Sequence, residues 1–328
     1  MALYSHIKPY LNDIESIMQL ELRREDERIY GMLPAFLKRG GKRIRPALAL
    51  LSCGAVGGHY TSVIEPAVVL ELFHNFTLIH DDIEDNSQFR RGEPALHITH
   101  GLPIALNSGD ALYTFLWKKL INLHLESSEL VELQKLCADS FKCVVDGQGV
   151  ELSWAKESKF HITEKEYYEM INGKTSALIG LACEMGAFIG GAGEPERIAL
   201  REYGKRIGTA FQIQDDVLNL TGDFEKYKKE IGGDISEGKR TLIVVHFLSK
   251  ANNTDKNKLI SILSSHSTKK ADIDLAIQLL GKHGSIEYAH HHACTLVEEA
   301  KSYLEILSPS KDKDTLIAVA DYVVNRES

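Results

Sequence analysis

Helical periodicity recurs along almost all of the 328 residues, and it constrains the fold more than any other feature. Apolar residues return at intervals of three and four, whereas no run alternates apolar and polar residues in the manner of a half-buried strand. Proline occurs only 8 times, about half of its usual share of roughly 5%. Because proline breaks helix interiors, this scarcity also favours helices. The chain is therefore predicted to be all-α.

The breaks between the helical stretches are turn-rich, and none has the composition of an interdomain linker. They fall at residues 38–46, 57–62, 86–94, 190–196, 221–240 and 307–314. A chain of this length has room for one large hydrophobic core, and we predict a single domain over residues 1–328. One helix start is marked clearly, because Thr163 and Glu166 in "TEKE" fit a capping box.

Charge and cysteine usage indicate the cellular setting. A net charge of −8 disfavours nucleic acid and anionic membranes as main partners. The five cysteines are scattered and never form a CxxC pair, as expected of reduced thiols in a cytoplasmic protein. The N-terminus lacks the basic and apolar regions of a signal peptide. The most apolar window, residues 176–193, is interrupted by Glu184 and predicts a buried helix rather than a membrane span.

The segment "LIHDDIEDNSQFRRGEPALH", residues 78–97, carries four acidic side chains followed by two arginines. The residues just before the acids, "FHNFTLIH" (73–80), are apolar and aromatic, so this helix is expected to leave a core and end in charge. Residues four apart lie on one face of a helix, and Asp81 and Asp85 therefore project together. The alternative is an acidic surface run with no further role.

A second acidic cluster, "FQIQDDVLN", occupies residues 211–219. Its polar side chains stand at positions i, i+3, i+4 and i+7, on one side of a helix. They are Gln212, Asp215, Asp216 and Asn219. Mg²⁺ takes oxygen ligands and is commonly bound by one or two carboxylates together with substrate phosphates. Two acidic helices therefore predict a magnesium site rather than a zinc site, which histidine and cysteine would indicate.

Basic residues gather in and around glycine-containing segments. They are Lys42, Arg43 and Arg45 after a glycine pair, Arg90 and Arg91 after the first acids, Lys174 beside Thr175 in "NGKTS", and Lys228, Lys229, Lys239 and Arg240. One such patch is typical of solvated surface, but several that converge bind phosphate strongly. The glycine-rich segment 221–240 is a candidate lid. Two diphosphates, one held through metal ions and one by basic side chains, would use all of these groups.

Through these motifs the chain resembles the trans-polyprenyl diphosphate synthases, which elongate isoprenyl chains. The resemblance runs from "GGKRIRP" through "LIHDDIEDNSQFRRGEPALH", "GKTS" and "FQIQDDVLNLTGD" to "GGDISEGKRTL". It implies the isoprenoid synthase fold, a bundle of long antiparallel helices around a deep central cavity, usually in a homodimer. It also implies two substrates, isopentenyl diphosphate and an allylic diphosphate. The implied cofactor is Mg²⁺, with three ions per active site once diphosphate is bound.

The resemblance also assigns roles to individual residues. The implied metal ligands are Asp81, Asp85 and Asp215. The side chains expected to contact the allylic diphosphate are Arg90, Lys174, Lys229 and Lys239. Those expected to bind isopentenyl diphosphate without metal are Lys42, Arg45, His74 and Arg91. Thr175 and Gln212 match groups whose oxygens face a developing carbocation.

The second acidic motif departs from the family pattern at Asn219, where many members carry a third aspartate. The departure removes one negative charge from the helical face that bears Asp215. We therefore predict a weaker affinity for Mg²⁺, with catalysis retained.

An aromatic stripe precedes the first acids, formed by Phe73, Phe76, Thr77 and His80. Ordinary core packing is the alternative for such a stripe. In the resembled family, the fourth and fifth residues before the first aspartate limit the product length, and here these are Thr77 and Phe76. A bulky aromatic at the fifth position and a small residue at the fourth resemble the archaeal-type geranylgeranyl diphosphate synthases. A C20 product is predicted, with farnesyl (C15) or C25 products as alternatives.

Three other functions remain open at this point. A class I terpene cyclase shares the first acidic motif and the all-α fold, but it would not need a site for isopentenyl diphosphate. A head-to-head synthase would join two allylic diphosphates. A non-catalytic subunit of a heteromeric synthase typically loses acidic ligands or lid lysines, and this chain retains both.

Overall fold

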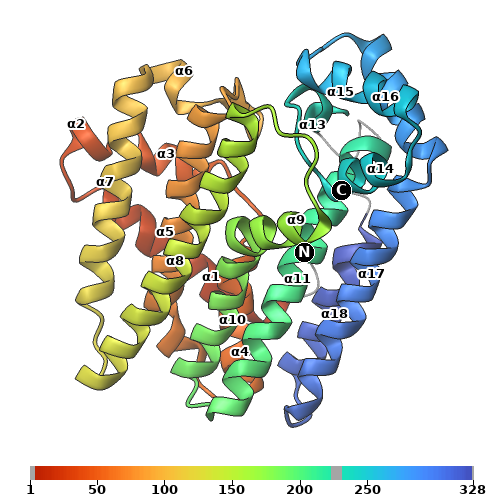
Figure 1. Cartoon of the computed structure of the whole chain (residues 1–328). Coiled ribbons are helices and arrows are strands. Elements are labelled where there is room, and N and C mark those ends of the chain that lie inside the picture. The colour runs from red at the N-terminus through yellow and green to blue at the C-terminus, as the bar shows by residue number, and fades with distance from the viewer. Residues whose placement is uncertain (1–3, 223–230, 327–328) are drawn as a thin grey trace. The chain divides into compact units, whose positions relative to one another are not determined.

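The computed structural model describes residues 4–222 and 231–326 and confirms the all-α prediction (Figure 1). In these ranges only one hairpin interrupts the helices, with strand β1 (Phe89–Arg90) antiparallel to β2 (Glu93–Pro94). The chain divides into two compact units. Unit 1 comprises residues 1–138, 181–200 and 307–316, and unit 2 comprises residues 139–180, 201–306 and 317–328. The single domain over residues 1–328 stays a prediction.

Unit 1 is built from the N-terminal helices around α5. Its elements are η1 (Ser5–Ile7), α1 (Lys8–Leu22), α2 (Glu27–Tyr30), α3 (Leu33–Lys38), α4 (Ile44–Ala55), α5 (Tyr60–Glu84), α6 (Leu96–His100) and α7 (Leu102–Ile121), with the hairpin between α5 and α6. Four further helices contribute residues to both units: α8 (Ser127–Lys156), α10 (Ala177–Ile189), α11 (Glu194–Thr221) and α18 (Lys311–Asn325).

The long helix α5 forms the centre of unit 1, where it packs against α1, α4 and α7. Its buried side chains are apolar along most of its length and include Val69, Leu72 and Phe73. By length and composition α5 alone, among the described helices, is a candidate membrane span, and 61% of its most apolar window is buried inside the protein. Such burial is typical of a core helix.

Unit 2 contains the remaining helices of the chain. They are α9 (Glu164–Ile171), the π-helical turn η2 (Asn172–Ser176), α13 (Gly233–Ser236), α14 (Leu242–Lys250), α15 (Asn253–Ser264), α16 (Lys270–Lys282), α17 (Ser285–Tyr303) and η3 (Leu304–Ile306). Helix α14 packs against α9, α16 and α17. The capping box predicted at α9 is confirmed, because the Glu166 amide donates to Thr163 Oγ1 (3.2 Å) and the Thr163 amide donates to Glu166 Oε2 (2.7 Å).

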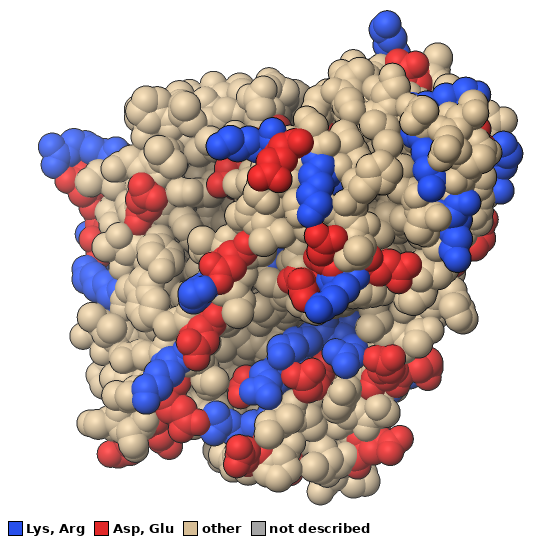
Figure 2. Space-filling model, viewed as in Figure 1, with Lys and Arg blue, Asp and Glu red and all other residues tan. Residues whose placement is uncertain are grey.

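Charged side chains of both signs are interspersed on the face drawn in Figure 2. Neither sign forms a continuous field there, in keeping with a modest net charge of −8. Recognition of an anionic substrate therefore requires a local basic site.

Candidate active site

The first acidic motif lies at the C-terminal end of α5. The helix closes in a Schellman motif, in which the Ser87 amide donates to Asp82 O (2.9 Å) and the Asn86 amide donates to Ile83 O (3.2 Å). Asn86 takes the left-handed conformation that this motif needs, with φ of 51°. Asp85 is the C-cap, and its amide still donates to Asp81 O (2.9 Å). The predicted i, i+4 relation of Asp81 and Asp85 therefore persists to the end of the helix.

This position is electrostatically unfavourable for carboxylates. The C-terminus of a helix carries a partial negative charge, so acids there lose stability and cations gain it. The last turn of α5 has no basic residue and holds Asp81, Asp82 and Glu84, with Asp85 at the cap. Acids at this end of a helix are stabilised when cations lie beside them.

The two adjacent aspartates of the motif have different environments. Asp82 is 1% exposed, and Arg90 Nε donates to its Oδ1 (2.7 Å). Burial raises the pKa of Asp82, and the contact with Arg90 opposes that rise. The Asp81 side chain is 26% exposed, and its Oδ2 lies 3.4 Å from Arg90 Nη2. Asp82 therefore anchors Arg90, and Arg90 in turn lies beside the more exposed carboxylate.

The hairpin that follows α5 places the two arginines on different partners. Its turn residues Arg91 and Gly92 have φ of 57° and 81°, as a tight turn between twisted strands requires. Arg90 lies in β1 and reaches the acids, whereas Arg91 Nη1 donates to Gly40 O. The turn therefore links the acidic helix end to the glycine pair of the basic loop.

The three basic residues of the loop before α4 have different roles: one stabilises the fold, and two are candidates for substrate binding. Arg43 is structural, because its guanidinium donates to Glu71 Oε1 (2.6 Å) and to Leu37 O (2.8 Å). Lys42 is exposed. Burial lowers the pKa of Arg45 to about 10, and its buried Nε has no hydrogen-bond partner among the described residues. A buried, unpaired guanidinium nitrogen is costly, and an anion would satisfy it.

His74 lies one helical turn from Glu71 on α5, close to the arginines of the basic loop and the hairpin. Burial lowers the pKa of His74 well below its usual value, and Arg45, Arg91, Arg90 and Arg43 lower it further. His74 is therefore neutral near pH 7 and offers a hydrogen bond without adding charge.

A pH effect on stability is expected from this depressed pKa. Below about pH 6.5 the unfolded chain binds a proton at residue 74 that the folded chain excludes, so stability falls as the pH falls. From pH 7 to pH 5.5, wild-type protein should lose about 1 kcal/mol more than His74→Gln. Urea unfolding at each pH measures this difference, and equal losses would contradict it.

The aromatic stripe on α5 packs against a partner that sequence reasoning did not identify. The centroid of the Phe76 ring lies 5.6 Å from that of Phe73 and 4.7 Å from that of His80. Beside it, the Thr77 hydroxyl donates a hydrogen bond to the His74 carbonyl oxygen (2.8 Å). From α7, the Tyr113 ring lies 4.9 Å from Phe76. The pairing of α5 with α7 is a long-range contact, and the only local signal was an aromatic pair, Tyr113 and Trp117, at helical spacing.

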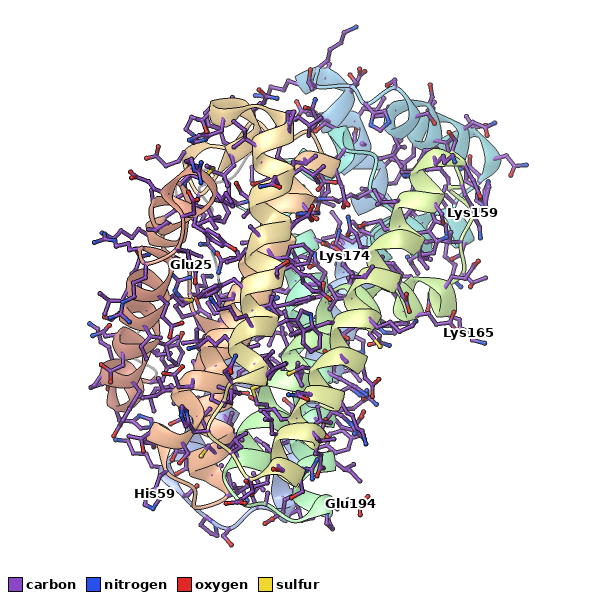
Figure 3. The ribbon with its side chains drawn as sticks, turned by 90° about the vertical axis from the view of Figure 1, so that its left-hand side faces the viewer. Glu25, His59, Lys159, Lys165, Lys174 and Glu194 are labelled. Atoms are coloured by element: carbon purple, nitrogen blue, oxygen red, sulfur yellow. The ribbon has the colours of Figure 1, made fainter. Side chains whose placement is uncertain are left out.

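In unit 2, Lys174 and Thr175 lie on the π-helical turn η2 between α9 and α10, where Figure 3 labels Lys174. Such turns are rare and frequently occur at functional sites. Lys174 Nζ donates to Glu151 Oε2 of α8. The two side chains are 23% and 20% exposed, respectively. Glu151 was not predicted from the sequence, because nothing local links residue 151 to residue 174.

A close approach of two backbones allows this contact. A Cβ added to Gly147 would lie 2.3 Å from the Lys174 amide nitrogen, and one added to Gly173 would lie 2.8 Å from Cys143 O. Neither glycine can be replaced without moving the backbone of η2 away from α8. Glycine at both positions therefore determines where Lys174 lies.

The polar groups of η2 and α11 form one chain of contacts. Thr175 Oγ1 lies 3.5 Å from Gln212 Oε1, and Gln212 Nε2 donates to Asp216 Oδ1 (2.9 Å). Asp216 is 5% exposed, and burial raises its pKa well above the usual value, with a further rise from Asp234. Its neighbour Asp215 pairs with Arg326 (2.5 Å). As in the first motif, the second aspartate is buried and the first is more exposed.

Asn219 and Lys239 connect this cluster to α13. Asn219 is 6% exposed, and its Oδ1 accepts a hydrogen bond from the Asp234 amide (3.1 Å) at the start of α13. Lys239 Nζ lies 3.3 Å from Asp234 Oδ1 and 2.5 Å from Glu237 Oε2. Lys228 and Lys229 lie outside the described residues.

The predicted site residues fall into two groups, one in each unit. Unit 1 contains Lys42, Arg45, Phe73, His74, Phe76, Thr77, Asp81, Asp85, Arg90 and Arg91, and unit 2 contains Lys174, Thr175, Gln212, Asp215 and Lys239. Within unit 1 the structure brings Arg90 to Asp81, and within unit 2 it brings Thr175 to Gln212. The roles of these residues stay predictions.

The carboxylates fit a hard divalent cation. Within residues 4–222 and 231–326, no three histidine, cysteine or acidic side chains are gathered as a preformed metal site. Mg²⁺ does not need such a cluster, because it keeps several waters and takes further oxygens from substrate phosphates. In unit 1 the oxygen donors of Asp81 and Asp85 suit such an ion, and in unit 2 the carboxylate of Asp215 does.

Comparison with known proteins gives one consistent result. The family profile described as Polyprenyl synthetase matches residues 26–280. A short chain isoprenyl diphosphate synthase from Methanothermobacter thermautotrophicus is 43% identical over 288 residues, which cover 88% of this chain and 87% of that protein. A geranylgeranyl diphosphate synthase from Methanosarcina mazei is 35% identical over 329 residues, with coverages of 100% and 99%.

Among solved structures, the geranylgeranyl pyrophosphate synthetase from Pyrococcus horikoshii matches with a TM-score of 0.93 at 36% identity. The match covers 99% of this chain and 98% of that one. The family profile, over residues 26–280, includes every candidate site residue from Lys42 to Lys239 and parts of both units.

Proposed function

Because this chain belongs to the trans-polyprenyl diphosphate synthase family, whose members are transferases, we propose that it condenses isopentenyl diphosphate with an allylic diphosphate to give mainly geranylgeranyl diphosphate. The acidic end of α5 carries the proposal. It places Asp81 and Asp85 on one helical face and Arg90 beside Asp81, at a helix end that favours cations. A diphosphate together with Mg²⁺ supplies both the cations and the anion that this arrangement can bind.

In the proposed reaction, Asp81, Asp85 and Asp215 hold Mg²⁺, with three ions per active site when diphosphate is bound. Mg²⁺ held by these carboxylates would supply positive charge opposite the departing diphosphate, which would favour cleavage of the allylic C–O bond. Cationic side chains donate hydrogen bonds to that same diphosphate. These are Arg90, Lys174, Lys239 and Lys229, of which Lys229 lies outside the described residues.

Isopentenyl diphosphate is proposed to bind the basic residues of unit 1 without metal. Arg45 offers its buried, unpaired Nε, and His74 lies among the same cations in its neutral form. Lys42 and Arg91 complete the set. Fixing this substrate near the allylic cation makes the attack of its C=C bond effectively intramolecular, which is a large part of the catalytic gain. The attack forms the new C–C bond, and loss of a proton from the former isopentenyl unit to the released diphosphate restores a C=C bond and completes the product.

Thr175 and Gln212 are proposed to present oxygens to the developing cation. Their contact, continued by Gln212 to Asp216, holds both side chains in place before the charge develops. Such preorganised dipoles cost little reorganisation during the reaction.

The product length is proposed to depend on Phe76, with Phe73 and Thr77 beside it. Tyr113 contacts Phe76 from α7 with the two rings tilted by 40°, and Phe76 lies about one helical turn before the proposed metal-binding acids. The proposed product is C20, and C15 or C25 products are the alternatives. The names of the Methanosarcina mazei and Pyrococcus horikoshii relatives support C20.

We further propose that the enzyme is a cytoplasmic homodimer in which both units form one catalytic domain.

One assay tests the proposal directly. Purified protein receives labelled isopentenyl diphosphate, Mg²⁺ and, in separate reactions, a C5, C10 or C15 allylic diphosphate. The products are dephosphorylated and sized by chromatography. Elongation to C20 is expected and should stop when the metal is chelated, whereas conversion of geranylgeranyl diphosphate alone would indicate a cyclase.

Asn219→Asp is expected to lower the Mg²⁺ concentration that gives half-maximal rate severalfold. The aspartate restores a negative charge one helical turn from Asp215, and ligand charge raises metal affinity. Its carboxylate can still accept the hydrogen bond from the Asp234 amide. Asn253→Asp, which adds the same charge at an exposed position on α15, is the control. An unchanged Mg²⁺ dependence would disprove the expectation.

A further inference from the structure

Arg326, the last described residue, is buried although it carries a permanent charge. Its side chain is only 2% exposed. Burying a guanidinium is costly unless hydrogen bonds and an opposite charge compensate for the lost water. The contacts that compensate Arg326 therefore indicate what this residue does.

Among the described residues, the contacts that compensate Arg326 come from α11 and from α18, which ends one residue before it. Arg326 Nη2 donates to Asp215 Oδ1 (2.5 Å) and to Phe211 O (3.0 Å), and Nε donates to Val323 O (3.3 Å). The guanidinium carbon also lies 3.9 Å from the centroid of the Phe211 ring, within the range of a cation–π contact. A planar, forked donor can make these contacts together, whereas the lysine ammonium is a single compact charge.

These contacts place one particular carboxylate. Phe211 and Asp215 are one turn apart on α11, so a guanidinium held against the first residue restricts the orientation of the second. Asp216 is held differently, through Gln212. Arg326 therefore acts on the more exposed aspartate of the motif, to which the proposed function assigns Mg²⁺.

We propose that Arg326 is a positioning residue that orients the Asp215 carboxylate for metal binding. This inference rests on the proposed function and adds a residue to its metal site. Hydrogen-bonded partners that orient metal ligands typically contribute about 10- to 100-fold to metal affinity. Arg326 follows α18 directly and is 111 residues away from Asp215 in sequence, so the proposal joins two distant segments of unit 2 at the metal site.

The test measures metal binding without turnover. Free Mn²⁺ is followed by electron paramagnetic resonance while it is titrated into full-length protein with inorganic diphosphate. Arg326→Gln should bind Mn²⁺ about 10- to 100-fold more weakly than wild type. Arg326→Lys should recover part of the loss. The control is Arg206→Gln, because Arg206 also pairs with a carboxylate (Glu299, 2.9 Å) and lies over an aromatic ring (Tyr303). The Mn²⁺ affinity of this variant should match that of wild type.

Repeating the substitution in an Asp215→Asn variant distinguishes an effect on the orientation of Asp215 from a general effect on the structure. In Asp215→Asn protein, adding Arg326→Gln should cause no further loss of Mn²⁺ affinity, because the oriented carboxylate is already absent. An equal loss in both backgrounds, or an unchanged or tighter affinity for Arg326→Gln, would overturn the inference. If Arg326→Gln does not fold, the Mn²⁺ affinity of Arg326→Lys is measured instead, both in otherwise wild-type protein and in the Asp215→Asn variant.

The wild-type elongation assay distinguishes the two levels of failure. Wild-type protein that elongates normally, together with Arg326→Gln that binds Mn²⁺ normally, rejects only the role of Arg326. Wild-type protein that never elongates an allylic diphosphate rejects the proposed function itself.

Discussion

Asp81→Asn is expected to lower the rate of prenyl transfer by about 10²- to 10³-fold, the usual loss when one preorganised electrostatic contact to the transition state is removed. The amide has nearly the shape of the carboxylate but lacks its charge, so it binds Mg²⁺ poorly. It also removes the ion pair between Asp81 and the neighbouring Arg90. Initial rates with labelled isopentenyl diphosphate over a range of Mg²⁺ concentrations measure the effect.

The effect of this substitution on folding should be small. Removing a negative charge from the C-terminal turn of α5 stabilises the metal-free protein by about 0.3–1 kcal/mol, which offsets the lost contact with Arg90. Lost activity in a protein with an unchanged melting temperature therefore reports on the metal site. Glu84→Gln, at an exposed acid of the same turn, is the matched control and should retain activity within about twofold. Equal losses in the two variants would reject a specific role for Asp81.

Phe76→Ala should move the main product from C20 to longer chains. The Phe76 ring is in contact with His80 on its own helix and with Tyr113 on α7, so its removal opens space beside the acids while Tyr113 still limits that space. The double variant Phe76→Ala with Tyr113→Ala should therefore give the longest products. Chromatography of the dephosphorylated products measures the shift.

Phe115→Ala on α7 is the control for this prediction. Phe115 is buried, and its ring centroid lies 6.1 Å from that of Tyr30. Its removal should cost about 3–5 kcal/mol of stability, as for other buried aromatic side chains, and leave the product distribution unchanged. A distribution that stays the same in Phe76→Ala would show that another residue limits the chain.

Several features of the site follow from short-range rules and were predictable. The capping box at Thr163 and Glu166 depends on residues three apart, and the shared face of Asp81 and Asp85 depends on residues four apart. The hairpin turn at Arg91 and Gly92 lies in a segment that was predicted as a break. Its short strands were not predicted, because two residues are too few to show an alternating pattern.

Which charged side chains pair with one another inside the protein was less predictable from the sequence. Arg43 belongs to the same basic run as Lys42 and Arg45, yet the structure pairs it with Glu71. Asp82 is indistinguishable by type from Asp81, yet it is buried under Arg90. A pattern of charges indicates that a site binds an anion or a cation, but the fold selects which charges neutralise one another.

The sequence by itself determined the all-α class, the two acidic helices and the order of the basic motifs, because helix periodicity and the choice of ligand chemistry reside in neighbouring residues. Tertiary structure alone decided that Tyr113 supports Phe76, that Glu151 holds Lys174 and that Arg326 reaches Asp215. Each of these contacts joins residues far apart in the chain, and the packing of whole helices determines whether such groups meet and how deeply they are buried.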